Sequence, residues 1–364
     1  MSPDFWRDKR VFVTGHTGFK GSWLCLLLHS FGARVTGYAL APPTDPSLYA
    51  LAGVGELVES TTGDIRDREA LAHAMHAARP EVVLHLAAQS VVLRSYDDPV
   101  ETYSTNVIGT VHTLEAVRQL KRPCTVVNVT TDKCYENKDW IWGYRETDPL
   151  GGRDPYSNSK ACAELVGQSY RDSFFPLSRV ADHGVAIASA RAGNVIGGGD
   201  WTPRQLVPEA IAAFLAAKPV VLRHPNAVRP WQHVLDCLAG YLSLAEALAG
   251  DPARYSGEWN FGPADTEART VAGVVEALAA LWQIERPWQQ DEGKHAPEEQ
   301  QLRLDVSKAA TSLGWRGRLS IDEALRWVAG WYRDHQKGAD ARALCFDQIA
   351  RHTGLTQTAA RWNS

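Results

Sequence analysis

Tyr156 and Lys160 are the first residues of this chain whose type and spacing could do chemistry. They stand four positions apart in the segment YSNSK, and this spacing places both side chains on one face of a helix. A nearby ammonium group lowers the pKa of a phenol, so the tyrosine could exchange a proton at neutral pH. The alternative is a surface tyrosine beside a solvated lysine. The position of the pair, 25 residues after Thr131, favours the catalytic interpretation.

A second group of reactive side chains is formed by Thr131, Asp132 and Lys133, which directly follow an apolar run predicted to be a strand. A hydroxyl, a carboxyl and an ammonium group at the carboxyl end of a strand would face a nicotinamide ring bound there. The alternative is a Thr-Asp pair that only caps the next turn. Taken with the other motifs, this group favours catalysis.

Three glycines, Gly15, Gly18 and Gly21, lie in the segment TGHTGFKG between a predicted strand and a predicted helix. The first permits a tight turn, the second lets the backbone approach a pyrophosphate, and the third lets the helix pack on the strand. The helix N-terminus adds N–H donors and the positive end of its dipole. Turns use glycine in any case, but this placement at the start of the first strand–helix unit predicts dinucleotide binding.

The segment after the second predicted strand, YALAP at residues 38–42, has no carboxylate for the ribose hydroxyls and no arginine for a 2′-phosphate. NAD is therefore favoured over NADP, and we expect NAD to bind weakly. Asp64 follows the third predicted strand and could accept a hydrogen bond from the adenine amino group. The alternative is an aspartate that only forms a turn.

The first half of the chain must position these motifs, and it alternates short apolar runs with helical patterns. Strands are predicted at residues 9–14, 34–38, 57–61, 81–86, 125–130 and 185–191, and helices at residues 22–31, 68–78, 99–120 and 158–174. This alternation predicts βαβ units, and therefore an α/β fold with a doubly wound parallel sheet of the Rossmann type.

The pattern changes in the second half. There we predict helices at residues 208–217 and 231–249, a short strand at 220–223, and a helix and turn at 305–315. Residues 1–191, with a return segment near 231–262, are expected to form an NAD-binding domain. Residues 192–230 and 263–364 are expected to form a smaller, mostly helical substrate-binding domain over the carboxyl ends of the sheet, where ligands bind in doubly wound folds.

Composition narrows the function classes. The chain has 364 residues, 45% of them hydrophobic, which is enough for a sizeable core and about two domains. Its net charge of −4, without long runs of like charge, argues against nucleic acids and membranes as partners. The first residues lack an apolar signal core, which predicts a cytoplasmic protein. Six cysteines without CxxC spacing and twelve histidines without an HExxH pattern predict no metal site.

Several motifs together make the chain recognisable. The segments TGHTGFKG, GDIRD, HLAAQ, TTDKCY, YSNSK and RAGNVIGGGDW resemble those of the extended short-chain dehydrogenases/reductases, and within that superfamily those of the nucleotide-sugar 4,6-dehydratases. The resemblance runs from about residue 9 to about residue 331. The Asp132-Lys133 pair is most similar to that of the dehydratases acting on CDP-glucose, because the dTDP-glucose enzymes have Asp-Glu there.

The resemblance implies a redox-neutral lyase that uses NAD and converts CDP-glucose into a 4-keto-6-deoxy sugar, as in the biosynthesis of deoxysugars for lipopolysaccharide O-antigen. It implies that Tyr156 takes the proton of the 4-hydroxyl group, Lys160 holds the ribose hydroxyls and Thr131 bonds the 4-oxygen. Asp132 then protonates the departing 6-hydroxyl group. Lys133 is either the base for the C5 proton or a cation that stabilises the enolate.

Further site residues are expected from the same motifs. The predicted NAD-binding residues are Gly15, Thr17, Gly18, Phe19, Gly21, Asp64, Ile65, Leu86, Ala87 and Ala88, together with Tyr156 and Lys160. The predicted substrate-binding residues are Ser90, Arg94, Asn194, Arg204 and Arg229. Asn194 and Arg229 are candidates for the phosphates, with a turn asparagine and a solvated arginine as the alternatives. Arg204 stands one place before the position of the family's basic residue, which is Gln205 here.

Two other function classes remain open at this point. A nucleotide-sugar 4-epimerase would share Tyr156 and Lys160 but needs no acid/base pair at Asp132 and Lys133. A binding protein on a degenerate dehydrogenase scaffold would not need an intact Thr131, Tyr156 and Lys160.

The helices at residues 99–120 and 158–174 carry apolar side chains on more than one face, and the resemblance implies a homodimer in which they form a four-helix bundle.

Overall fold

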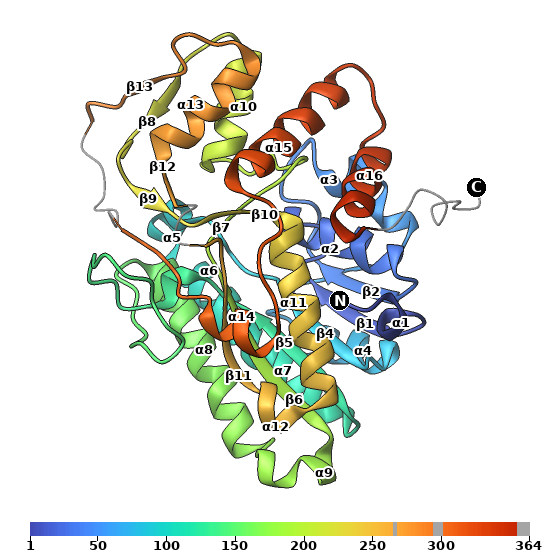
Figure 1. Ribbon diagram of the computed structural model, residues 1–364. Coiled ribbons are helices and arrows are strands. Elements are labelled where there is room, and N and C mark those ends of the chain that lie inside the picture. The colour runs from blue at the N-terminus through green and yellow to red at the C-terminus, as the bar shows by residue number, and fades with distance from the viewer. Residues whose placement is uncertain (265–267, 294–300, 355–364) are drawn as a thin grey trace.

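The computed structural model describes residues 1–264, 268–293 and 301–354. Its central sheet has seven parallel strands in the order β11-β6-β5-β4-β1-β2-β3 (Figure 1). The strands are β1 (Arg10–Thr14), β2 (Arg34–Ala39), β3 (Glu59–Thr62), β4 (Val82–His85), β5 (Cys124–Val129), β6 (Val185–Ala192) and β11 (Gly257–Phe261). The strand order reverses between β1 and β4, as in a doubly wound Rossmann sheet, and confirms the predicted fold class.

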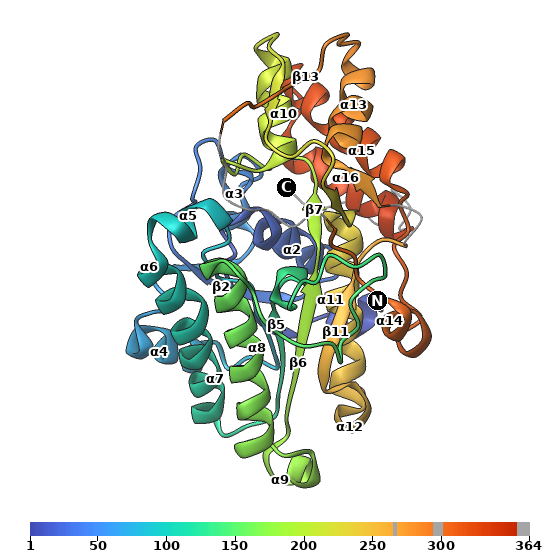
Figure 2. The ribbon, with the colours of Figure 1, turned by 90° about the vertical axis from the view of Figure 1, so that its left-hand side faces the viewer.

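Helices cover both faces of this sheet (Figure 2). One face carries α4 (Arg68–Ala78), α7 (Gly109–Leu120) and α8 (Pro155–Ser173), and the other carries α2 (Phe19–Ser30) and α11 (Val234–Gly250). The strands β4, β5 and β6 are therefore buried along their whole length, and most of their side chains are apolar. The edge strand β3 is exposed at all four residues.

Polar residues fix the starts of the helices beside the site. The Asp154 carboxylate accepts the Ser157 N–H at 2.9 Å, and Pro155 stands at the first position of α8. The Asp67 carboxylate caps α4 in the same way, by accepting the Ala70 N–H at 3.0 Å. These caps set the position at which each helix begins.

The second part of the chain stands over the carboxyl ends of the sheet (Figure 1). It contains α10 (Leu206–Leu215), α13 (Val271–Trp282) and α15 (Ile321–Gln336), while α14 (Ser307–Ser312) packs against β11 and α16 (Ala341–Thr353) packs against α2. Three small sheets accompany them: β7 (Asn194–Ile196) with β10 (Trp231–His233), β8 (Val220–Leu222) with β13 (Trp288–Gln290), and β9 (Val228–Arg229) with β12 (Arg269–Thr270).

Short elements complete the described residues. They are α1 (Pro3–Trp6), α3 (Leu48–Leu51), a 3-10 turn at Val54–Glu56, α5 (Val92–Asp97), α6 (Pro99–Tyr103), a π-helical turn at Ser104–Ile108, 3-10 turns at Asp132–Cys134 and Leu177–Arg179, α9 (Val180–His183) and α12 (Pro252–Tyr255). Among these residues no helix has the length and apolar character needed to cross a membrane. No group of three or more His, Cys, Asp or Glu side chains in the described part of the chain is arranged to hold a metal ion.

Two predicted helices differ from the structure. The helix predicted at residues 231–249 starts at Val234, because Trp231–His233 pairs as a strand with Asn194–Ile196. The helix predicted at residues 99–120 contains the π-helical turn Ser104–Ile108, which turns Asn106 into the interior. The seventh strand, β11, was not predicted, although it completes the sheet beside β6.

Candidate active site

A cleft of about 1160 Å³ opens at the carboxyl ends of the strands, beneath the second part of the chain. It is lined by every residue predicted for cofactor, catalysis or substrate: Gly15, Thr17, Gly18, Phe19, Gly21, Asp64, Ile65, Leu86, Ala87, Ala88, Ser90, Arg94, Thr131, Asp132, Lys133, Tyr156, Lys160, Asn194, Arg204 and Arg229. The strands that carry these residues are parallel, so their carboxyl ends meet at one edge. The structure thus brings the predicted residues together, and their individual roles stay predictions.

The segment TGHTGFKG at residues 14–21, called the glycine loop below, has the geometry of a diphosphate site. Gly15 has a φ of +78°, and a Cβ atom there would lie 2.8 Å from the Ala87 nitrogen. A Cβ atom on Gly21 would lie 2.1 Å from the Gly15 carbonyl oxygen, so this glycine lets α2 pack on the loop. At Gly18 the nearest atom would be 3.5 Å away, and the backbone there faces the cleft at the start of α2. A dinucleotide therefore fits this loop.

At the other end of this nucleotide region, the residues after β2 offer no side-chain charge. Ala39, Leu40 and Ala41 line the cleft, and the Thr17 hydroxyl donates to the Leu40 carbonyl oxygen at 2.9 Å. The Asp64 carboxylate accepts the Arg66 N–H at 2.8 Å and its guanidinium at 2.6 Å, and Arg66 holds the pKa of that carboxyl below its usual value. Asp64 thus forms the turn that was one of the two alternatives, and the adenine contact stays a prediction.

The reactive groups meet between the end of β5 and the first turns of α8. The Lys160 ammonium donates to the Val129 carbonyl oxygen at 3.1 Å, and the Thr131 hydroxyl lies near enough to the Tyr156 phenol to lower its pKa. The Thr131 hydroxyl also lies 3.1 Å from an Asp132 carboxylate oxygen. All of these side chains are buried. A proton acceptor and a carboxyl group therefore share one enclosed corner of the cleft.

The Thr-Asp pair also caps a turn, as the alternative interpretation held. The Thr131 hydroxyl accepts the Lys133 N–H at 3.3 Å at the start of the 3-10 turn. The capping bond fixes the turn and leaves Asp132 and Lys133 in the cleft lining, so the two interpretations are compatible.

Burial controls the protonation of the Tyr156–Lys160 pair. It raises the pKa of Tyr156 well above its ordinary value, and the Thr131 hydroxyl opposes this while the Asp132 and Asp154 carboxylates add to it. This direction is opposite to the expectation that the neighbouring ammonium group leaves Tyr156 with a lowered pKa, and burial is its largest cause. Burial also lowers the pKa of Lys160 to about 8, and the Lys20 ammonium adds to this shift.

The predicted substrate residues line the same cleft from the segment after β4 and from the second part of the chain. Asn194 begins β7, so it is not the turn residue of the alternative interpretation, and Arg229 is buried in β9 rather than solvated. The guanidinium groups of Arg94 and Arg204 pair with the Glu101 and Asp97 carboxylates at 2.7 and 3.2 Å. These two arginines are exposed and would have to share or exchange their partners on binding a phosphate.

Sequence reasoning missed four cations of the cleft lining, which are Lys20, Arg66, Arg153 and Arg223. Lys20 and Arg66 stand inside the quoted segments TGHTGFKG and GDIRD, so their motifs were a usable signal. Arg223 follows β8 and had no such signal. The positive side chains around the cleft suit a ligand with phosphate groups.

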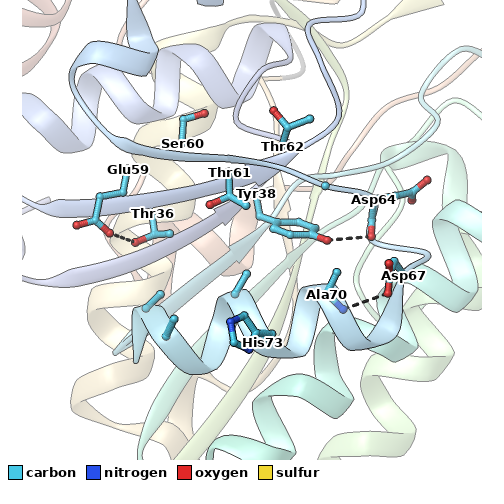
Figure 3. Close-up of a pocket in the computed structure, with 14 residues that line it drawn as sticks. Thr36, Tyr38, Glu59, Ser60, Thr61, Thr62, Asp64, Asp67, Ala70 and His73 are labelled. Carbon is cyan, nitrogen blue, oxygen red and sulfur yellow. Dashed lines mark hydrogen bonds between the residues drawn. The ribbon is translucent and has the colours of Figure 1, made fainter.

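A second hollow, of about 700 Å³, lies between the edge strand β3 and α4 (Figure 3). Its walls include Glu59, which accepts the Thr36 hydroxyl at 3.2 Å, and several alanines of α4. Among the described residues that line it, Asp64 is the one predicted for the site. None of the residues predicted for catalysis lines this hollow.

Comparison with known proteins identifies the family. A profile of the GDP-mannose 4,6 dehydratase family matches residues 12–328. The chain belongs to this dehydratase family. It is 50% identical over 356 residues to the CDP-glucose 4,6-dehydratase of Salmonella typhimurium, covering 98% of this chain and 99% of that protein. It is 30% identical over 339 residues to a dTDP-glucose 4,6-dehydratase of Streptomyces antibioticus, covering 90% and 93%.

Solved structures share the fold of this dehydratase. A dTDP-glucose 4,6-dehydratase of Streptomyces venezuelae with NAD bound superimposes with a TM-score of 0.78 at 24% identity, over 91% of this chain and 99% of that one. A UDP-glucose 4-epimerase of Thermotoga maritima gives a TM-score of 0.75 at 23% identity, over 90% and 99%. The fold is therefore common to dehydratases and epimerases, and the site residues must distinguish the two activities.

In this dehydratase a glycine makes room for the acid group. A Cβ atom on Gly193 would lie 3.1 Å from a carboxylate oxygen of Asp132 and 2.5 Å from a side-chain carbon of Pro230. The loop between β6 and β7 thus lies against the Asp132 carboxylate. A larger residue in place of Gly193 would displace either Asp132 or Pro230.

Proposed function

We propose that this protein is an NAD-dependent CDP-glucose 4,6-dehydratase, a hydro-lyase that forms the 4-keto-6-deoxy sugar nucleotide. The observation that carries the proposal is the convergence of Tyr156, Lys160, Thr131 and Asp132 in one buried corner beside the glycine loop. The choice of CDP-glucose is supported by 50% identity to the Salmonella enzyme over nearly the whole of both chains.

The cofactor would lie along the glycine loop and the ends of β1, β4 and β5. The N–H groups at the start of α2 would face its diphosphate, while Leu86, Ala87 and Ala88 would line its path. The Lys160 ammonium would hold the nicotinamide ribose hydroxyls. When bound there, NAD supplies a hydride acceptor for C4 and the hydride donor for C6.

The protein's own groups would move the protons of the oxidation step. Tyr156 would take the proton of the sugar 4-hydroxyl group, and Thr131, which lies near the phenol, would hold the 4-oxygen. Because burial raises the pKa of Tyr156, the phenol is protonated at rest. The proton must therefore leave as the substrate binds, and the Lys160 ammonium one helical turn away would favour the phenolate.

Elimination would use the turn that follows β5. Oxidation of C4 to a ketone acidifies the C5 proton, which Lys133 would remove as the C6–oxygen bond breaks. Asp132 would give its proton to the departing hydroxyl group, so that water leaves. Asp132 is almost fully buried and lies 3.1 Å from the Thr131 hydroxyl, in the same corner of the cleft as Tyr156.

The nucleotide sugar would be held by the predicted substrate-binding residues of the cleft lining. Asn194 and Arg229 would contact the diphosphate, and Arg204 would lie near the nucleoside end. Ser90 and Arg94 would approach the sugar from the segment after β4. Residues 1–191 with 231–262 would then bind NAD, and residues 192–230 and 263–364 would bind the sugar nucleotide.

The proposal is tested by incubating the purified protein with NAD and, separately, CDP-glucose, dTDP-glucose, UDP-glucose and GDP-mannose. The 4-keto product absorbs in alkali, and we expect it with CDP-glucose first. Tyr156→Phe is the control, because it removes the proton acceptor and should form no product. An absence of 4-keto product with all four sugars, or formation of the C4 epimer instead, would overturn the proposal.

The same proposal extends to assembly and location. The exposed apolar side chains Val100 and Ile108 lie on the helices after β4, and Leu165 and Phe174 lie on or just after α8. These side chains support a homodimer joined through these helices as a four-helix bundle. A homodimer acting in the cytoplasm, in the synthesis of deoxysugars such as those of O-antigen, fits a nucleotide-sugar substrate.

A further inference from the structure

A row of contacts joins the end of β5 to one face of α8. Glu164 lies one helical turn beyond Lys160, on the face that carries Tyr156 and Lys160. The Thr130 hydroxyl donates to the Glu164 carboxylate, and the carbonyl oxygen of the adjacent Val129 accepts the Lys160 ammonium at 3.1 Å. Consecutive residues of the strand end are thus fastened to successive turns of the helix.

Arg191, at the end of β6, closes this row from the other side. Its guanidinium group binds both carboxylate oxygens of Glu164, at 3.0 and 3.1 Å, and the two side chains are 2% and 1% exposed. The same guanidinium donates to the Tyr135 hydroxyl at 2.8 Å and lies over its ring, 4.8 Å from the centroid. Tyr135 directly follows the 3-10 turn, so both ends of the segment that carries Asp132 are held.

Asn260, in β11, anchors this cluster to the second half of the chain. Its side-chain oxygen accepts the Tyr135 hydroxyl at 2.7 Å. Its amide group donates to the carbonyl oxygens of Tyr144 and Asp305 at 2.8 and 3.0 Å. Side chains from β6, β11, α8 and the end of β5 therefore form one continuous buried network.

Removing the charged groups of this network from water costs free energy. The network also lies outside the cleft lining. A buried ion pair contributes little net stability compared with apolar side chains of similar volume. Tyr135, Glu164 and Arg191 are not among the residues that line the cleft, whereas every residue assigned to substrate or cofactor is. A geometric role accounts for such a set: it aligns the turn at Asp132 with the reactive face of α8.

We propose that Tyr135, Glu164 and Arg191 are positioning residues for the dehydration, holding Asp132 in register with Tyr156 across the cleft corner. This inference rests on the proposed function, since it concerns the elimination step. A misplaced acid group would slow elimination while leaving the binding of NAD and sugar nucleotide intact.

Tyr135→Phe tests the proposal, because it removes one hydroxyl group and keeps the ring. We expect kcat to fall about 10- to 100-fold, with KM for CDP-glucose and the calorimetric NAD affinity within about twofold. Tyr255→Phe is the matched control. It removes a hydroxyl group that donates to the Ser312 carbonyl oxygen at 3.2 Å, away from the cleft, and should keep wild-type kcat.

A second measurement separates positioning from mere stability. In the Asp132→Asn background, Tyr135→Phe should change the residual rate less than about twofold, because the group that it aligns is already disabled. Equal effects of Tyr135→Phe in both backgrounds would overturn the proposal, as would a wild-type kcat in the single variant. If the wild-type protein itself makes no 4-keto product, the proposed function falls and this inference with it.

Discussion

Lys133 lines the cleft directly after Asp132, at the position where the resembling dTDP-glucose enzymes have a glutamate. A lysine in water is protonated at neutral pH, so a base at this position must lose its proton before it can act on C5. The half-buried side chain beside the buried Asp132 gives this residue two chemical options, base and fixed cation.

We predict that Lys133 acts as the base. Lys133→Ala should still oxidise C4, seen as NADH absorbance on mixing with CDP-glucose, but should fail to exchange the C5 proton with deuterated solvent. Lys133→Arg should fail in the same way, because a guanidinium group keeps the charge but cannot accept the proton. Normal C5 exchange in Lys133→Ala, or substantial turnover in Lys133→Arg, would leave the lysine only an electrostatic role.

Lys160 makes NAD binding dependent on pH. Burial lowers the pKa of its ammonium group to about 8, so the charge is present below this pH and is lost above it. If the ammonium holds the ribose hydroxyls, NAD affinity should be constant below pH 7 and fall about tenfold for each pH unit above 8. Calorimetric titrations at pH 7 and pH 9 check this. Equal affinities at the two pH values would contradict the role given to Lys160.

At the scale of elements, the end of β2 predicts weak NAD binding. Ala39 and Leu40 leave the adenosine ribose without a charge-assisted bond worth roughly 1.5–3 kcal/mol, or about ten- to a hundredfold in affinity. Leu40→Asp or Ala39→Asp should recover part of the lost NAD affinity, measured by calorimetry. Leu40→Asn is the uncharged control. An unchanged affinity in both aspartate variants would mean that another group already holds that ribose.

The helices after β4 and β5 predict a dimer. Leu165 is 53% exposed and Val100 77% exposed on the surface that we assign to the interface. We expect sedimentation at micromolar concentration to show a dimer, and Leu165→Lys to shift it towards monomer. Leu215→Lys, at a similarly exposed position on α10, should leave the sedimentation unchanged. A wild-type monomer would remove the bundle interface.

The elements were predictable where local pattern and burial agree. The helix at Arg68–Ala78 was predicted with its observed bounds because Asp67 caps it and an apolar stripe faces the sheet. The strand Trp231–His233 was not, since its three residues continue into an apolar helix and depend on a partner strand in sequence-distant β7. The strand β11 was likewise missed, because pairing with β6 rather than local pattern defines it.

At the scale of the whole molecule, the reactive side chains were predictable and their supports were not. Tyr156 and Lys160 are four residues apart, so local geometry alone places them together. Glu164, Arg191 and Asn260 are separated by as many as 96 positions, and their contact follows from the order of strands in the sheet. The raised pKa of Tyr156 was also missed, because it depends on burial that the sequence does not state.

The central claim is that one molecule of sugar nucleotide is oxidised at C4 and reduced at C6 within the same site. CDP-glucose carrying deuterium at C4 tests it most directly, with the product examined by mass spectrometry and NMR. The account predicts a CDP-4-keto-6-deoxy sugar with the deuterium in its C6 methyl group. Recovery of the deuterium at C4 of an epimer, or its loss from the sugar into free NADH, would contradict the account.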